Sequence, residues 1–231
     1  AEAGDAAGAQ AAFTAALGYD ANSAEARGWL ARMNVTIEKQ AQVDAARRAE
    51  AMGELDQAAG HYRGALSHGP DEALETDLRR VDAGIALAQA EQLITSGQLE
   101  LAGAELAKAK RLAPDNIAID QAIVRHEQHV RYRDFVRQGD GFAEQGRFAQ
   151  ATRAYRKARD TMDTEQIRQR LDDTEFNHLL AQARSYISNK QWTSANGILN
   201  TAANLRITDE LNQLREQVAA ELDKANGGGN G

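Results

Sequence analysis

Apolar side chains recur at intervals of three and four residues along most of the chain, which predicts amphipathic α-helices rather than strands. The clearest pattern lies at 146–159 and begins with Gly146, where a tight turn favours a residue without a Cβ atom. Its apolar helix face consists of Phe148, Ala151, Tyr155 and Ala158. The window 53–66 carries the same pattern, and the two windows share six identical residues when aligned without a gap. The chain therefore contains an internal repeat.

Three weaker copies of the pattern begin at Gly4, Gly97 and Lys190. The copies that follow longer helical segments predict short helices at 54–67, 98–111, 147–160 and 191–204. Longer helical patterns precede or follow them at 24–52, 72–96, 116–145, 165–189 and 208–224. The first copy, at 1–17, has no longer helix before it, so we expect the chain to be a fragment or a processed form of a longer protein. The fold class that this predicts is all-α.

The repeat resembles the tetratricopeptide repeat (TPR) family in the second helix of all five copies. That family shows a turn glycine, a small residue five positions on, a large apolar residue four later and an alanine three after that. It closes with a proline five positions after the alanine. Pro70 and Pro114 stand five positions after Ala65 and Ala109, and they are the two prolines of the chain. The first half of the family motif is best seen at Phe135, Gly139 and Phe142, and the first helices otherwise diverge. The resemblance implies a right-handed α-solenoid of helical hairpins that binds proteins or peptides.

The period departs from the family. The spacing between repeat starts alternates between 49 and 44 residues, against about 34 for TPR proteins. The alternation indicates a tandem super-repeat of 93 residues, and the tetrapeptide Leu-Ala-Gln-Ala at 87–90 recurs 93 positions later at 180–183. We therefore expect extended first helices within a single TPR-like repeat domain over 1–224, followed by a flexible tail over 225–231. The domain comprises units 4–96 and 97–189, and a partial third unit with a capping helix at 190–224.

The long segment 116–145 does not keep its apolar residues on one face. Either the helix bends, with Gly139 and Gly141 as candidate sites, or its two halves pack on different neighbours. The second alternative is favoured, because the extra length would then bridge the two 93-residue units.

Composition excludes several classes of function. The chain has 231 residues, a formal net charge of −7 and no cysteine, which argues against nucleic-acid binding through bulk charge and against disulfides or thiolate zinc sites. No run of 18 apolar residues is present, so no membrane span is expected. Arginine outnumbers lysine by 21 to 6, which indicates a GC-rich bacterial source and leaves the compartment open between periplasm and cytoplasm.

No catalytic or cofactor motif is apparent. His126-Glu127-Gln128-His129 is one residue short of the helical metalloprotease motif and has no evident third ligand, so we interpret the two histidines as surface residues. Glycine-rich phosphate loops and nucleophile motifs are missing. The sequence therefore predicts a protein that is not an enzyme and that has no metal ion and no cofactor.

One charged feature is a candidate binding site. Basic residues recur every four positions along the longest predicted helix, at Arg125, His129, Arg133 and Arg137, with Arg131 beside them. In TPR proteins the first helices line the concave surface, where basic residues can hold an acidic peptide. The resemblance implies that this basic stripe binds a partner in a groove between the two 93-residue units. The alternative is a solvated face paired with nearby Asp and Glu.

The sequence therefore predicts a non-enzymatic protein-protein interaction scaffold of TPR type. It would bind a protein or peptide partner, acidic if the stripe is the site, through the concave or inter-unit groove. The rival interpretation is a structural spacer or oligomerisation arm within a larger bacterial secretion or envelope assembly, and homo-oligomerisation is left open.

Overall fold

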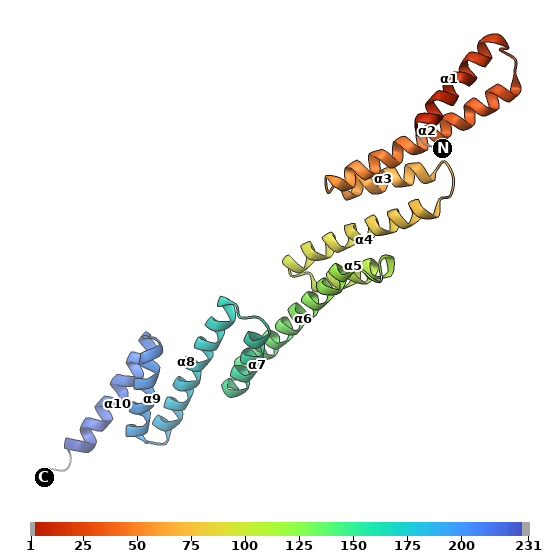
Figure 1. Ribbon diagram of the computed structural model, residues 1–231. Helices are drawn as coiled ribbons and strands as arrows, with labels where there is room; N and C mark the ends of the chain where they lie inside the picture. The colour runs from red at the N-terminus through yellow and green to blue at the C-terminus, as the bar shows by residue number, and fades with distance from the viewer. Residues whose placement is uncertain (1–2, 228–231) are drawn as a thin grey trace. The chain divides into compact units, whose positions relative to one another are not determined.

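The computed structural model describes the backbone of residues 3–227 and the side chains of residues 8–224 (Figure 1). The described residues form ten α-helices and no strand, which confirms the all-α prediction. The helices are α1 (Ala3–Tyr19), α2 (Ala24–Ala51), α3 (Leu55–Leu66), α4 (Glu72–Thr95), α5 (Leu99–Leu112), α6 (Ile117–Glu144), α7 (Phe148–Thr161), α8 (Glu165–Ser188), α9 (Trp192–Leu205) and α10 (Asp209–Gly227).

Helices α2 to α9 begin and end within one residue of the predicted segments. Helix α10 runs to Gly227, three residues into the segment predicted as a tail. The rest of that segment, 228–231, lies outside the described residues, as do residues 1 and 2 of the first predicted helix.

The first residue of each of the last four repeat copies, glycine in three and lysine in one, closes a turn of the same kind. Gly53, Gly97 and Gly146 have φ values of 76°, 76° and 68°, and Lys190 takes the same left-handed conformation at 57°. In each turn the next residue donates its N–H to the carbonyl five positions back, as in the bond from Arg147 N to Phe142 O of 2.9 Å. This is the Schellman pattern, which satisfies carbonyls at the end of a helix and reverses the chain. Each turn therefore leads from a long helix straight into the next short one.

By contacts between residues, the chain divides into two compact units, residues 1–126 and 127–231. In the first unit α3 packs on α2 and α4, and α5 packs on α4 (Figure 1). Tyr62 is the largest fully buried residue of this unit, at 1% exposure. Its neighbours are mostly small, because alanines such as Ala46, Ala58 and Ala65 fill the contact between the helices.

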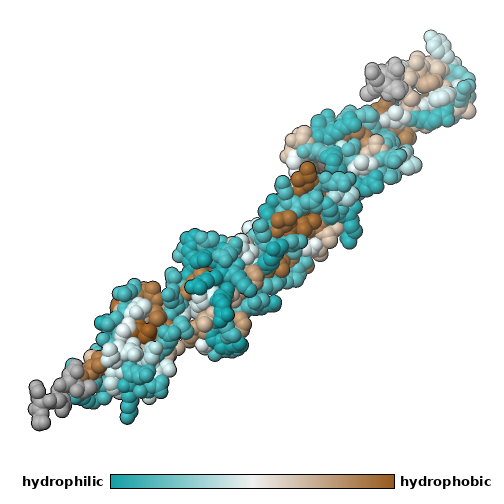
Figure 2. All heavy atoms as spheres, turned by 60° about the horizontal axis from the view of Figure 1, so that its bottom comes forward, coloured by the Kyte–Doolittle hydropathy of each residue, from teal (hydrophilic) through white to brown (hydrophobic). Residues whose placement is uncertain are grey.

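In the second unit α7 packs on the later part of α6 and on α8, and α9 packs on α8 and α10. Tyr155 is buried at 3% exposure between α6 and α7, the place that Tyr62 holds between α2 and α3. The prediction that these two tyrosines occupy equivalent buried sites is confirmed. On the face shown in Figure 2, hydrophilic residues cover most of both units.

The helix lengths follow the 93-residue interval. Helices α2 and α6 each have 28 residues, and α4 and α8 each have 24. All four helices from α2 to α5 begin 93 positions before their counterparts from α6 to α9. This regularity supports the tandem super-repeat, whereas superposition of the two copies and the handedness of the solenoid stay predictions.

The two parts of α6 pack on different neighbours, as predicted. Ile119 and Ala122 are fully buried with residues of α4 and α5 in the first unit. Tyr132, Phe135 and Phe142 pack against Tyr155 and its neighbours in the second unit. The change of apolar face along this helix therefore reflects a change of packing partner.

Candidate functional site

The arginines of the basic stripe have carboxylate neighbours on their own chain. Arg125 pairs with Glu91 of α4 at 2.7 Å, and Arg137 lies 3.4 Å from Asp134, one turn away on α6. Arg133 lies 3.7 Å from the same Asp134 carboxylate. The side chain of Arg137 is 78% exposed and that of Arg125 is 49% exposed, so both stay in solvent while paired.

These pairs agree with the solvated-face alternative for the stripe. His129 is half-buried, and Arg131 pairs with Glu127 on its own helix at 3.1 Å. A partner that binds these guanidinium groups would compete with the intramolecular carboxylates. The role of Arg125, His129, Arg133 and Arg137 in partner binding, and the groove they were expected to line, stay predictions.

His126 has a structural contact that the sequence did not reveal. Its Nε2 lies 2.7 Å from the carbonyl oxygen of Leu99, and its ring edge would touch a Cβ atom at Gly103. The absence of a side chain at Gly103 thus lets α5 approach this ring. Within the described residues no group of three or more metal-binding side chains comes together.

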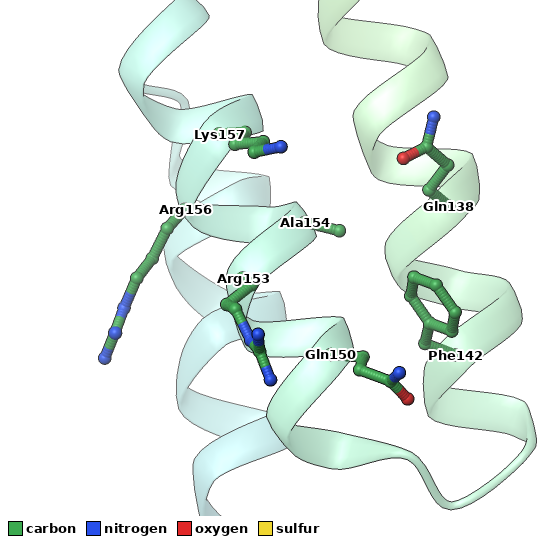
Figure 3. A pocket seen from close by; sticks show the side chains of 7 residues that line it. All are labelled: Gln138, Phe142, Gln150, Arg153, Ala154, Arg156 and Lys157. Atoms are coloured by element: carbon green, nitrogen blue, oxygen red, sulfur yellow. The ribbon is translucent and has the colours of Figure 1, made fainter.

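A hollow between α6 and α7 is a candidate for a binding site (Figure 3). It encloses about 320 Å³. Gln138 and Phe142 of α6 form one wall, and Gln150, Ala154 and Lys157 of α7 face them. Arg153 lies along the open front of the hollow, whereas Arg156 leaves α7 on the side away from α6. All these residues belong to the second unit.

A part-buried network joins the two walls. The hydroxyl of Tyr155 on α7 donates to Asp140 of α6 at 2.6 Å, and Arg170 of α8 donates to the same carboxylate at 3.0 Å. Burial and the bond to Asp140 raise the pKa of Tyr155 well above its ordinary value. Gly139 allows the ring this position, since a Cβ atom there would lie 2.3 Å from Cε1 of Tyr155. The hollow therefore rests on a rigid part of the hairpin.

The same network occurs in the first unit with its charges moved along the helices. There Tyr62 donates to Glu50 at 2.6 Å, and Arg80 binds both oxygens of Glu50, at 2.5 and 3.0 Å. Relative to the 93-residue offset, the carboxylate and the arginine are each displaced by three residues, about one helical turn, in the same direction. Because the carboxylate and the arginine are displaced by the same number of residues, both copies contain the ion pair.

The three cations at the hollow have no carboxylate partner among the described residues, and two of them, Arg153 and Lys157, lie beside the space between α6 and α7, whereas Arg156 points away. Arg153 and Lys157 are exposed, and four residues separate them on α7. The Nε of Arg153 donates to the backbone oxygen of Ala149 at 3.3 Å, and the Nζ of Lys157 lies 5.7 Å from the centre of the Phe135 ring. Each can therefore accept an external anion without breaking an intramolecular ion pair.

The first copy of the repeat lacks this site. At the 93-residue offset, Gly60 and Gly64 replace Arg153 and Lys157, and Ala49 replaces Phe142. His61 replaces Ala154, and its Nδ1 lies 2.8 Å from the side-chain oxygen of Gln42 on α2. In the second copy the small Ala154 leaves the corresponding space open. The two copies share the buried Tyr and Ala residues, so the hairpin does not need the residues that form the hollow.

Sequence reasoning missed this site because it treated 146–159 as a core helix. A signal was present in the comparison of the two windows, where the differing positions carry four added cations, Arg153 and Lys157 among them. What the sequence could not show is that Gln138 and Phe142 of another helix face them.

A second hollow, of about 600 Å³, lies in the first unit where α4 meets the connection between α5 and α6. Arg79 and Arg111 line it and have no carboxylate partner among the described residues. Asp115 also lines it, and Arg80 is already bound to Glu50. This mixed charge makes the second hollow a weaker anion site than the one beside α7.

Comparisons with known proteins identify no family. No family model matches the chain, and no curated protein is significantly similar to it. The crystal structure of the TPR domain of P58(IPK) is similar at 15% sequence identity over 96% of this chain and 95% of that one, with a TM-score of 0.30. That TM-score is too low to establish a shared overall arrangement. None of the described helices has the length and apolar character to cross a membrane.

Proposed function

We propose that the protein is a non-enzymatic interaction scaffold of TPR type that binds a partner protein at the hollow between α6 and α7. The observation that carries the proposal is the pair of exposed cations, Arg153 and Lys157, without intramolecular carboxylates beside a half-buried Phe142. The chain as a whole has a net charge of −7, so the charge of this local cationic site is opposite in sign to that of the chain.

The chemistry of the hollow favours binding over catalysis. Its lining side chains are two amides, a phenyl ring, a methyl group and three cations. A histidine, carboxylate, hydroxyl or thiol, the groups that act most often as general bases or nucleophiles, does not occur among them. Amides and cations around an aromatic ring can hold a peptide by hydrogen bonds, charge and apolar contact.

The repeat architecture supports the same function. Stacked helical hairpins expose a large side-chain surface relative to their length, and single hairpins can change on the outside while the core is kept. The hairpins α2–α3 and α6–α7 follow this pattern, since they share buried residues and differ at the positions that line the hollow. Within this proposal partner binding does not need the basic stripe, because its arginines already have carboxylate neighbours.

A second candidate function is the oligomerisation arm. Ile117 and Val124 stand seven residues apart on one face of α6 and are 72% and 54% exposed, and Leu101 of α5 is 56% exposed. Exposed apolar residues of this size mark interfaces when they are contiguous. Sedimentation equilibrium of the wild type and of Ile117→Ser/Val124→Ser tests it, since a dimer that the double variant dissociates would favour this function.

Partner capture tests the scaffold proposal. Tagged wild type and the variant Arg153→Glu/Lys157→Glu are incubated with lysate of the source organism, and bound proteins are quantified by mass spectrometry. The variant Arg133→Glu/Arg137→Glu carries the same charge change on α6 and is the matched control. We expect at least one protein to be lost from the α7 variant and retained by the α6 variant. A set of captured proteins that is equal for the wild type and the α7 variant would contradict the site.

A further inference from the structure

The hollow is open on one side and has a volume of about 320 Å³ between the facing sides of α6 and α7. An extended segment lying along it would direct side chains to both walls, since successive side chains of an extended chain point to opposite sides.

The spacing of the cations matches such a chain. Arg153 and Lys157 are four residues apart on α7, so their Cα atoms lie about 6 Å apart along the helix axis. In an extended peptide, residues two apart lie about 6.6 Å from each other on the same side. Two acidic residues in positions 1 and 3 of a tripeptide can therefore face Arg153 and Lys157 together.

The opposite wall selects the residue between them. Successive side chains of an extended chain point to opposite sides, so the middle residue would face α6, where Phe142 presents its ring and Gln138 its amide. An apolar side chain is the one that gains from this contact. Gln138 has a donor and an acceptor for the backbone of the peptide, and the amide nitrogen of Gln150 can donate to it while the oxygen of Gln150 accepts from Arg147.

We propose that the hollow between α6 and α7 binds an extended acid–apolar–acid segment of a partner protein, with both acids on Arg153 and Lys157 and the apolar residue on Phe142. This proposal rests on the function proposed above and gives the chemical class of its partner. Charge favours this occupant over a basic or neutral segment. The guanidinium of Arg153 can grip a carboxylate with two parallel bonds, and the ammonium of Lys157 acts as a point charge.

Two peptides of the same composition test the proposal. The probe is acetyl-Gly-Glu-Leu-Glu-Gly-amide, and its control, acetyl-Gly-Glu-Glu-Leu-Gly-amide, has the same charge in the wrong order. Binding to the full chain is followed by amide chemical shifts in nuclear magnetic resonance titrations. We expect the probe to bind at least fivefold tighter than the control and to shift the signals of Gln138, Phe142, Gln150 and Ala154.

Variants distinguish binding at the hollow from a general effect of positive charge. Arg153→Gln/Lys157→Gln should weaken binding of the probe at least tenfold, while Arg156→Gln, which removes a cation pointing away from α6, should change it less than twofold. Circular dichroism verifies that both variants stay folded, as expected for exposed side chains. Equal binding of the two peptides, or equal loss in the two variants, would overturn the proposal.

The two proposals fail in different ways. If a captured protein depends on Arg153 and Lys157 but neither peptide binds, the extended acid–apolar–acid segment is wrong and the scaffold function stands. If the probe binds as expected but no captured protein depends on these residues, the peptide chemistry is correct and the proposed function fails.

Discussion

At the scale of single residues, Lys190 is the one repeat-turn position where a side chain is forced into a glycine conformation. Its φ of 57° matches the values of the three turn glycines. The left-handed conformation costs an L-residue about 1–2 kcal/mol. A glycine at this position would avoid that cost, but it would also give the unfolded chain more conformational freedom, which offsets part of the gain. The left-handed conformation of Lys190 allows Gln191 N to donate to Tyr186 O at 2.9 Å, which closes the turn.

We therefore expect Lys190→Gly to stabilise the chain by about 0.5–1 kcal/mol. Gly97→Lys, the reverse change at an equivalent turn, should destabilise it by a similar amount. Urea unfolding followed by circular dichroism measures both free energies. A Lys190→Gly variant no more stable than the wild type would show that the turn carries no strain.

Two glycines of α6 should respond to the same substitution with opposite signs. A Cβ atom at Gly139 would lie 2.3 Å from Cε1 of Tyr155, whereas one at Gly141 would have no atom within 4 Å. Gly139→Ala must displace the buried ring and should cost about 1–3 kcal/mol. Gly141→Ala should gain up to about 1 kcal/mol of helix propensity. Equal effects in urea unfolding would contradict the close packing of Tyr155.

The buried tyrosines predict a loss of stability at high pH. Burial, together with the bond to Glu50, raises the pKa of Tyr62 from 10.0 to about 12. The unfolded chain releases this proton near pH 10 and the folded chain near pH 12, so the stabilisation is complete below pH 10 and is lost as the pH rises through 12.

Tyr62→Phe removes this dependence. At pH 7 the variant should be about 1–2 kcal/mol less stable than the wild type, because a hydrogen bond to a charged group is lost. Between pH 10 and 12 the difference in unfolding free energy should shrink. Tyr19→Phe, at a residue that is 95% exposed, is the control. A difference between wild type and Tyr62→Phe that is constant with pH would contradict the buried hydrogen bond.

At the scale of helices and hairpins, the boundaries could be predicted because their signals are local. Apolar spacing gives the period, and the glycines mark the Schellman turns within a few residues of the helix they end. Ion pairs could not be predicted in this way. Arg125 and Glu91 are 34 residues apart in sequence, and their contact depends on how α6 packs on α4.

The candidate site was hidden for the same reason. The stripe on α6 and the cations on α7 are both basic patterns at a spacing of four residues, and the sequence alone favours the longer one. The two patterns differ in their carboxylate neighbours: the stripe arginines have them in the folded chain, whereas the cations on α7 have none among the described residues. Tyr155 illustrates the predictable part, since its burial follows from the repeat, whereas its bond to Asp140 breaks the 93-residue register and appears only in the structure.

At the scale of the whole molecule, helix starts follow the 93-residue interval while exposed residues differ. Helices α2 to α5 and α6 to α9 begin 93 positions apart, and in each set a buried Tyr bonds to a carboxylate that also pairs with an arginine of the following long helix. Glycines occupy the positions of Arg153 and Lys157 in the earlier copy. In the proposed function, the hairpin of α6 and α7 therefore binds the partner and that of α2 and α3 does not.

Site-specific photo-crosslinking at two matched glutamines tests this claim most directly. Gln57 and Gln150 are identical residues at the same position of the two hairpins, and only Gln150 lines the hollow. Each is replaced in turn by benzoylphenylalanine, and the chain is irradiated with the partner found by capture. We expect position 150 to crosslink to the partner and position 57 not to. Equal yields at the two positions, or a crosslink from position 57 alone, would contradict it.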